Sequence, residues 1–211
     1  MSNQQEQLNA LNDIRKMMDR SSRFISLSGL SGIFAGVTAL VSAYFAHGLL
    51  AEYAKDGADP YSGIGNSLIE GNIMLLGAVT FMVALFGATL FTMRQSRKKN
   101  LPIWDKTAKN LLINLAIPLL TGGVFILALL YNQLGSYGLI APSCLLFYGL
   151  ALLNAGKYTY SDIRFLGICE IILGLISLFN IGYGLYFWAF GFGILHILYG
   201  LIMYFKYERV K

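Results

Sequence analysis

Long apolar stretches separated by short polar connections make up most of the chain. A helix needs about 20 mostly apolar residues to cross a bilayer, and about 17 is the lower limit. The pattern predicts an all-α, polytopic membrane protein with six transmembrane helices, of which the fourth and fifth are short. The expected spans are approximately 24–50, 68–93, 108–131, 139–155, 163–179 and 185–205.

Residues 1–22 are polar and precede a single transmembrane domain over residues 23–211. Leu8, Leu11, Ile14 and Met18 recur at helical spacing, which predicts a short amphipathic helix. Such a helix can lie on the inner leaflet or dock on a partner. A frayed tail that ends in a helix cap at Ser21 or Ser22 explains the same residues equally well.

Composition supports the membrane class. The chain is 56% hydrophobic and only 13% charged, whereas soluble domains carry roughly 25% charged residues. Cys144 and Cys169 both lie in apolar stretches, so no disulfide framework is expected. The sequence contains no phosphate-cradling loop, HExxH pattern or nucleophile elbow. We therefore expect no enzymatic activity, no cofactor and no bound metal.

The distribution of basic residues sets the expected orientation. If both termini are cytoplasmic, the inner segments hold fifteen of the sixteen Lys and Arg residues, and the outer segments hold Lys55. This asymmetry follows the positive-inside rule and supports an even number of spans. The net charge of +5 thus indicates affinity for anionic lipid at the cytoplasmic face rather than for nucleic acid. The inner basic residues are Arg15, Lys16, Arg20, Arg23, Arg94, Arg97, Lys98, Lys99, Lys106, Lys109, Lys157, Arg164, Lys206, Arg209 and Lys211.

Two ionisable residues lie inside the expected spans, each within a Gly-x6-Gly frame. Glu170 is flanked by Gly167 and Gly174, and His196 by Gly193 and Gly200. On a helix these glycines share a face with the central residue. An ionisable side chain at membrane depth is a functional-site hypothesis by default.

The short connection between the last two spans places Glu170 and His196 at nearly the same depth. A contact between them would lower the cost of burying either group alone. The first hairpin places His47 opposite Glu70, although its long loop fixes the register less tightly. The sequence therefore predicts a deep Glu170–His196 pair and an outer His47–Glu70 pair.

Three interpretations of the deep pair remain open. The pair can be purely structural, as a polar contact between two helices. Such contacts stabilise membrane proteins by about 0.6 kcal/mol on average. The pair can instead exchange protons, as transport proteins require. Metal or haem ligation is the third, but a two-histidine haem needs both imidazoles at one depth, and His47 lies well above His196. Access of water to Glu170 and His196 discriminates between the first two.

Glycines at helical spacing predict close helix–helix packing, because backbone contact drives association in lipid. Gly32 and Gly36 also form a GxxxG pattern. The glycines assigned to packing faces are Gly29, Gly32, Gly36, Gly149, Gly156, Gly167, Gly174, Gly193 and Gly200.

The first span, ISLSGLSGIFAGVTALVSAYFA, and the last, LYFWAFGFGILHILYGLIMYFKYE, resemble an uncharacterised family of small multi-pass bacterial inner-membrane proteins. The resemblance extends along the whole chain. It implies a bacterial inner-membrane location and transfers no catalytic role.

Together these features predict a non-enzymatic integral membrane protein that acts as an accessory or interaction module in the bilayer. Its expected partners are lipid and either a second copy of the chain or another membrane protein. The alternative is a small proton-linked transporter or channel that uses Glu170 and His196 as a relay.

Overall fold

The computed structural model describes residues 24–55, 67–131 and 137–209, together with residues 5, 7–9 and 11. The all-α expectation is confirmed for these residues, which contain helices and connections but no strand. Most of the expected amphipathic helix at residues 1–22 and most of the first outer loop lie outside the described residues.

Each expected span corresponds to a helical segment. The first four are α2 (Gly29–Lys55), α3 (Ser67–Lys98), α4 (Lys106–Tyr131) and α5 (Ile140–Ala155), the last preceded by the 3-10 turn η1 (Tyr137–Leu139). The fifth is α6 (Ser161–Leu178). The sixth runs through α7 (Gly184–Trp188), η2 (Ala189–Leu195), α8 (His196–Met203) and η3 (Tyr204–Glu208). The segments η2 and η3 are π-helical.

The first helix begins five residues later than the expected start at Phe24. Residues 24–28 are not helical, although Phe24, Ser26 and Ser28 are buried. Serine side chains bond to nearby backbone groups in non-helical conformations and so favour helix starts. Hydrophobicity alone assigned these residues to the span, because it does not register this local competition.

Four helical segments are long and apolar enough to cross a membrane among the described residues. They are Gly29–Glu52, Gly71–Lys98, Lys106–Tyr131 and Gly184–Glu208. Helix α5 has 16 residues and is a shorter apolar helix. Helix α6 carries Asp162, Arg164 and Glu170 within its 18 residues, which raises its polarity.

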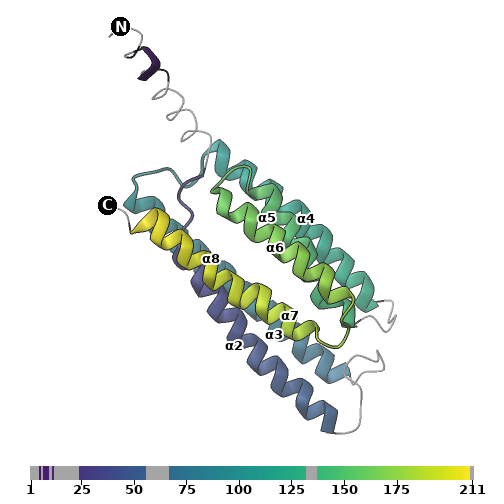
Figure 1. The fold of residues 1–211 in the computed structure, drawn as a ribbon. Helices are drawn as coiled ribbons and strands as arrows, with labels where there is room; N and C mark the ends of the chain where they lie inside the picture. Colours follow the sequence, from purple (N-terminus) through teal and green to yellow (C-terminus); the bar gives the residue numbers. More distant parts are fainter. Residues whose placement is uncertain are drawn as a thin grey trace.

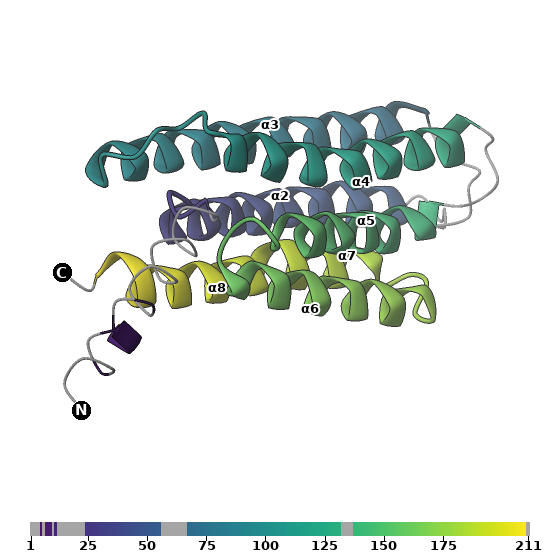
Figure 2. The same ribbon diagram turned by 90° about the horizontal axis from the view of Figure 1, so that it is seen from above.

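The helices form two groups that lie side by side (Figure 1). In the α2 group, α2 packs against α3 and against the continuous helix α7–η2–α8. In the α5 group, α5 packs against α4 and α6. Figure 2 shows α3 and α4 on one side of the molecule, α2 and α5 in the middle, and α8 and α6 on the other side.

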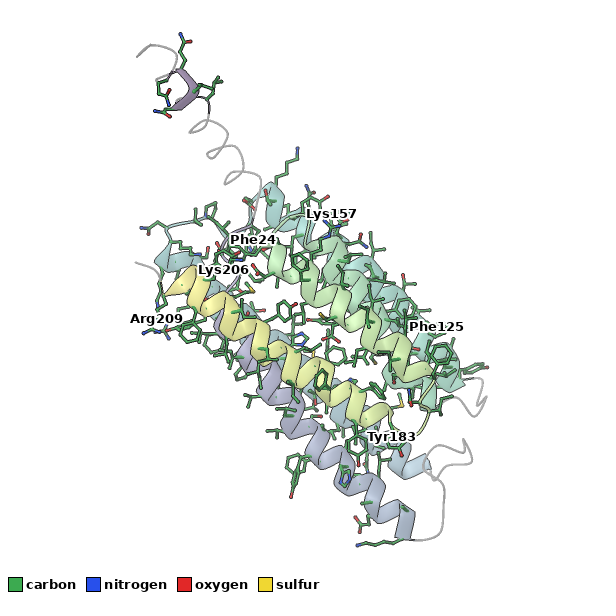
Figure 3. The ribbon with its side chains drawn as sticks, in the orientation of Figure 1. Phe24, Phe125, Lys157, Tyr183, Lys206 and Arg209 are labelled. Carbon is green, nitrogen blue, oxygen red and sulfur yellow. The ribbon has the colours of Figure 1, made fainter. Side chains whose placement is uncertain are left out.

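A cluster of buried hydrophobic residues joins the two groups. Leu152, Ile163 and Leu166 of the α5 group pack there with Met203 of α8. Figure 3 shows Phe24, Lys157, Lys206 and Arg209 at one end of the bundle, which we call the Phe24 end. Phe125 and Tyr183 lie at the opposite end, which we call the Tyr183 end (Figure 3).

Candidate functional site

Glu170 lies on α6 and has no exposed surface. Its carboxyl group points towards η2, where a Cβ added to Gly191 would lie only 2.5 Å from Oε2. A side chain larger than hydrogen at Gly191 would therefore displace the carboxyl group. Both carboxyl oxygens are buried and have no hydrogen-bond partner among the described residues.

His196 is the first residue of α8, directly after the π-helical segment η2. Its Nδ1 lies 3.0 Å from the carbonyl oxygen of Gly191. A carbonyl can only accept a hydrogen bond, so Nδ1 donates this one. In the neutral ring Nε2 is then an acceptor, and it receives a hydrogen bond from the hydroxyl of Tyr148 at 2.8 Å.

The structure brings Glu170 and His196 together, as the hairpin register indicated. Oε1 of Glu170 lies 3.5 Å from Nδ1 of His196, and His196 is only 6% exposed. Nδ1 points to the Gly191 carbonyl rather than to the carboxyl group, which explains the longer separation. Tyr148, Glu170 and His196 form what we call the central cluster, which joins α5, α6 and α8.

Tyr148 is the member of this cluster that sequence reasoning missed. It lies on α5, and its ring contacts both Phe192 and His196 at centroid distances of 5.0 and 5.3 Å. A buried tyrosine hydroxyl usually finds a hydrogen-bond partner. The position of Tyr148 near the middle of the fourth expected span was therefore the available signal.

A glycine seam joins α2 to the last helix. A Cβ on Gly36 would lie 2.6 Å from the carbonyl oxygen of Gly193, and one on Gly32 would lie 3.2 Å from Cα of Gly200. A Cβ on Gly29 would meet the backbone of Gly200. These glycines allow the backbones of α2 and α8 to touch, which holds His196 at a fixed position.

A second glycine seam joins α5 to α6. A Cβ on Gly149 would lie 2.7 Å from the carbonyl oxygen of Gly167, and the reverse contact has the same distance. Gly156 faces Arg164, and Gly174 faces Leu145 and Leu146 on α5. The seam fixes Glu170 relative to Tyr148, because these two residues lie on the joined helices.

The outer pair predicted at His47 and Glu70 stays a prediction. His47 lies on α2, and its ring packs edge-on against Tyr186 of α7 at a centroid distance of 6.2 Å. The side chain of Glu70 lies outside the described residues.

A polar network at the Phe24 end anchors residues 24–28, and sequence reasoning did not foresee it. The backbone N–H of Phe24 donates to the carbonyl of Tyr158 at 2.7 Å, and Thr159 Oγ1 donates to the carbonyl of Phe24 at 2.8 Å. Tyr160 and Lys99 both donate to the carbonyl of Ile25. This segment thereby connects the two helix groups.

The last residues of η3 belong to the same network. Glu208 accepts hydrogen bonds from the Ser28 hydroxyl at 3.1 Å and from the backbone N–H of Gly29. A residue 179 positions away thus caps the start of α2. Tyr207 donates to Asp162 at 2.6 Å, which ties η3 to the start of α6.

Burial shifts the pKa of two side chains that lie between helices at this end. It lowers the pKa of Lys99, while the nearby carboxylate of Glu208 opposes that shift. Burial also raises the pKa of Tyr160 to about 12, with further contributions from Tyr207 and Glu208. Tyr207 stacks on Tyr160 with ring centroids 4.0 Å apart, which contributes to this burial.

The fold and the site define a class rather than a single activity. The described part of the chain is all-helical, four of its helices are long and apolar enough to span a membrane, and a buried polar cluster joins its two helix groups. No protein-family model, curated protein or solved structure matches the chain. Among the described residues, no group of three or more His, Cys, Asp and Glu side chains is placed to hold a metal ion.

Proposed function

We propose that the chain is a six-span protein of a bacterial inner membrane with both termini in the cytoplasm, where it acts as a non-enzymatic interaction module. The two spans beyond the four long ones are α5 and α6. A 16-residue helix extends about 24 Å, which suffices in a locally thinned bilayer. The basic residues at the Phe24 end, including Lys157, Lys206 and Arg209, support its cytoplasmic placement (Figure 3).

The observation that carries this proposal is the burial of the central cluster. Glu170 is 0% exposed and His196 is 6% exposed. Both ring nitrogens of His196 are already engaged, by Gly191 and by Tyr148. Such a cluster supports one fixed arrangement of the two helix groups, with the carboxyl group enclosed by its neighbours.

The outer helices supply the surface on which such a module would act. Helix α3 packs mainly on α2, and α4 packs mainly on α5. Their remaining faces expose large apolar side chains, among them Phe81, Phe86, Leu120 and Val124. In a bilayer these faces meet lipid, a second copy of the chain or another membrane protein. The basic residues at the Phe24 end would meet anionic lipid.

A proton-linked transporter is the second candidate, and one observation favours it. Both oxygens of Glu170 are buried without a hydrogen-bond partner in the described structure. A buried ionisable group at the junction of two helix groups can belong to a proton relay. The adjoining π-helical segment also fits, since such segments occur frequently at functional sites.

Proton flux in proteoliposomes separates the two candidates. We expect wild type, Glu170→Gln and His196→Ala to show the same proton flux as protein-free liposomes under an imposed pH gradient. Folding is checked by circular dichroism and size-exclusion elution in detergent. Flux in the wild type that disappears in both folded variants would establish the transporter and overturn the module.

The proposed topology has its own test. Single cysteines at Lys55 and Lys157 are labelled with a membrane-impermeant maleimide in intact spheroplasts, after Cys144 and Cys169 are replaced by serine. We expect labelling at position 55 and none at position 157 until the membrane is opened. The reverse pattern would contradict the proposed orientation.

A further inference from the structure

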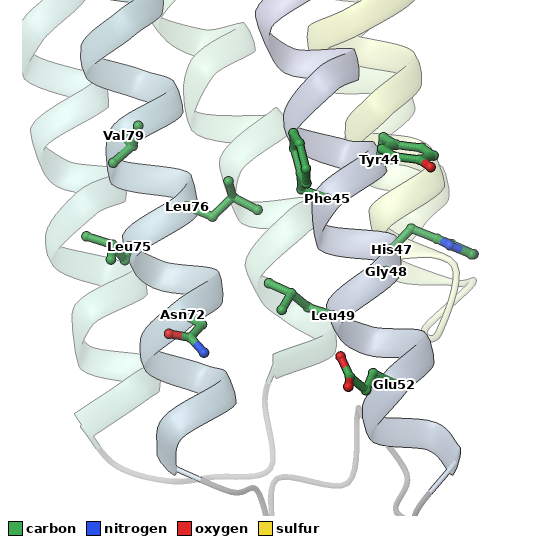
Figure 4. A pocket seen from close by; sticks show the side chains of 10 residues that line it. All are labelled: Tyr44, Phe45, His47, Gly48, Leu49, Glu52, Asn72, Leu75, Leu76 and Val79. Atoms are coloured by element: carbon green, nitrogen blue, oxygen red, sulfur yellow. The ribbon is translucent and has the colours of Figure 1, made fainter.

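A groove of 710 Å³ runs between α2 and α3 at the Tyr183 end (Figure 4). Its walls are apolar and include Phe45 and Leu49 of α2 with Leu76 and Val79 of α3. The volume falls within the roughly 300–1,000 Å³ of sites for small molecules. Phe45 is 57% exposed and Val79 is 49% exposed, so the groove opens sideways, where a bilayer would contact it.

The polar lining of the groove gathers near the helix ends. Glu52 lies one turn before the end of α2, and Asn72 lies near the start of α3. Figure 4 shows Glu52 directed into the space between the helices and Asn72 on the near face of α3, with Leu49 deeper in the same space, further from the helix ends. A hydrocarbon chain fits the deep part, and a polar headgroup fits the end.

The charges at that end select the headgroup. The Glu52 carboxylate and the negative end of the α2 dipole attract a cation that donates hydrogen bonds. A protonated primary amine is such a cation, because its N–H groups donate to a carboxylate or an amide oxygen. A quaternary ammonium headgroup has no N–H to donate, and the Glu52 carboxylate repels a purely anionic headgroup.

We propose that this groove binds a phospholipid with a primary-amine headgroup, with its ammonium group on Glu52 and Asn72 and its acyl chain against Leu49 and Leu76. The leaflet is the outer one under the proposed topology. Binding itself depends on neither the orientation nor the interaction role, because the groove is formed by α2 and α3 alone.

Native mass spectrometry tests the assignment. Wild-type protein in mild detergent is equilibrated with equal amounts of phosphatidylethanolamine, phosphatidylcholine and phosphatidylglycerol with identical acyl chains. We expect phosphatidylethanolamine to be enriched among retained lipids. Glu52→Gln keeps the shape and removes the charge, so it should lower that enrichment about tenfold, the effect of losing one charge-assisted hydrogen bond.

Two tryptophan variants separate the groove from the general lipid surface. Leu49→Trp fills the groove and should abolish the enrichment. Val41→Trp places the same bulk on an exposed site of α2 outside the groove and should leave it unchanged. Enrichment that survives Leu49→Trp in folded protein would overturn the proposal. Equal retention of phosphatidylcholine or phosphatidylglycerol would overturn the amine assignment.

Discussion

The hydroxyl of Tyr148 lies 2.8 Å from Nε2 of His196, and this hydrogen bond crosses the boundary between the two helix groups. Tyr148 belongs to α5 and His196 to α8, at the end of a π-helical segment. The bond leaves Nδ1 of His196 directed to the Gly191 carbonyl and so orients the ring beside Glu170. The position of the Glu170–His196 pair therefore depends on Tyr148, a residue outside the pair.

Removal of the Tyr148 hydroxyl should weaken the junction between the groups. We expect Tyr148→Phe to lower the free energy of unfolding in detergent by about 0.5–2 kcal/mol, since Nε2 of His196 loses its donor. Equilibrium unfolding of Tyr148→Phe, His196→Ala and the double variant measures the coupling. Strictly additive effects would show that the bond contributes nothing.

Replacing a glycine by alanine where α2 touches α8 should destabilise the protein. A Cβ on Gly200 would lie 2.6 Å from the backbone nitrogen of Ile33 and 2.7 Å from the carbonyl oxygen of Gly29. We expect Gly200→Ala to cost about 1–3 kcal/mol, because rigid backbone must move. Thermal unfolding in detergent measures the loss.

Gly77→Ala is the matched control for this substitution. Nothing lies within 4 Å of a Cβ at Gly77 on α3. Alanine should therefore be neutral there, or stabilising by up to about 1 kcal/mol through its helix propensity. Equal losses at both sites would contradict the seam, since the effect would then not depend on packing.

Truncation of Glu208 should loosen the start of α2. The side chain accepts hydrogen bonds from Ser28 and from the Gly29 N–H. We expect Glu208→Ala to cost about 0.5–2 kcal/mol, the usual value of an N-cap. Hydrogen exchange should quicken at the amide of Gly29. Glu208→Gln retains an acceptor oxygen and should restore most of the protection, which a purely electrostatic role of the carboxylate would not allow.

The phenol of Tyr160 should resist ionisation. Because its pKa in the folded protein is about 12, above the ordinary value near 10, its contribution to stability is complete below pH 10. That contribution is lost as the pH rises towards 12. The near-ultraviolet difference between wild type and Tyr160→Phe should show phenolate only near that pH. Phenolate near pH 10 in protein that remains folded by circular dichroism would contradict burial of this residue.

Much of the helical architecture could be predicted from apolar stretches, because a helix that crosses lipid must be apolar along its length. The residue at which α2 begins could not be predicted, since its cap comes from Glu208 near the other end of the chain. The depth match of Glu170 and His196 followed from a short connection. The hydrogen bond from Tyr148 to His196 could not be predicted in this way, because Tyr148 lies on α5, outside that hairpin.

The sequence by itself determined the helical class and the approximate helix bounds, since these depend on local composition and spacing. Only the tertiary structure decided that the helices divide into two groups. It also placed Glu170 beside Gly191, with no hydrogen-bond partner among the residues that the structure describes, and formed a groove between α2 and α3. These features depend on which glycine faces meet across the bundle, and many glycines in the chain could serve as such faces.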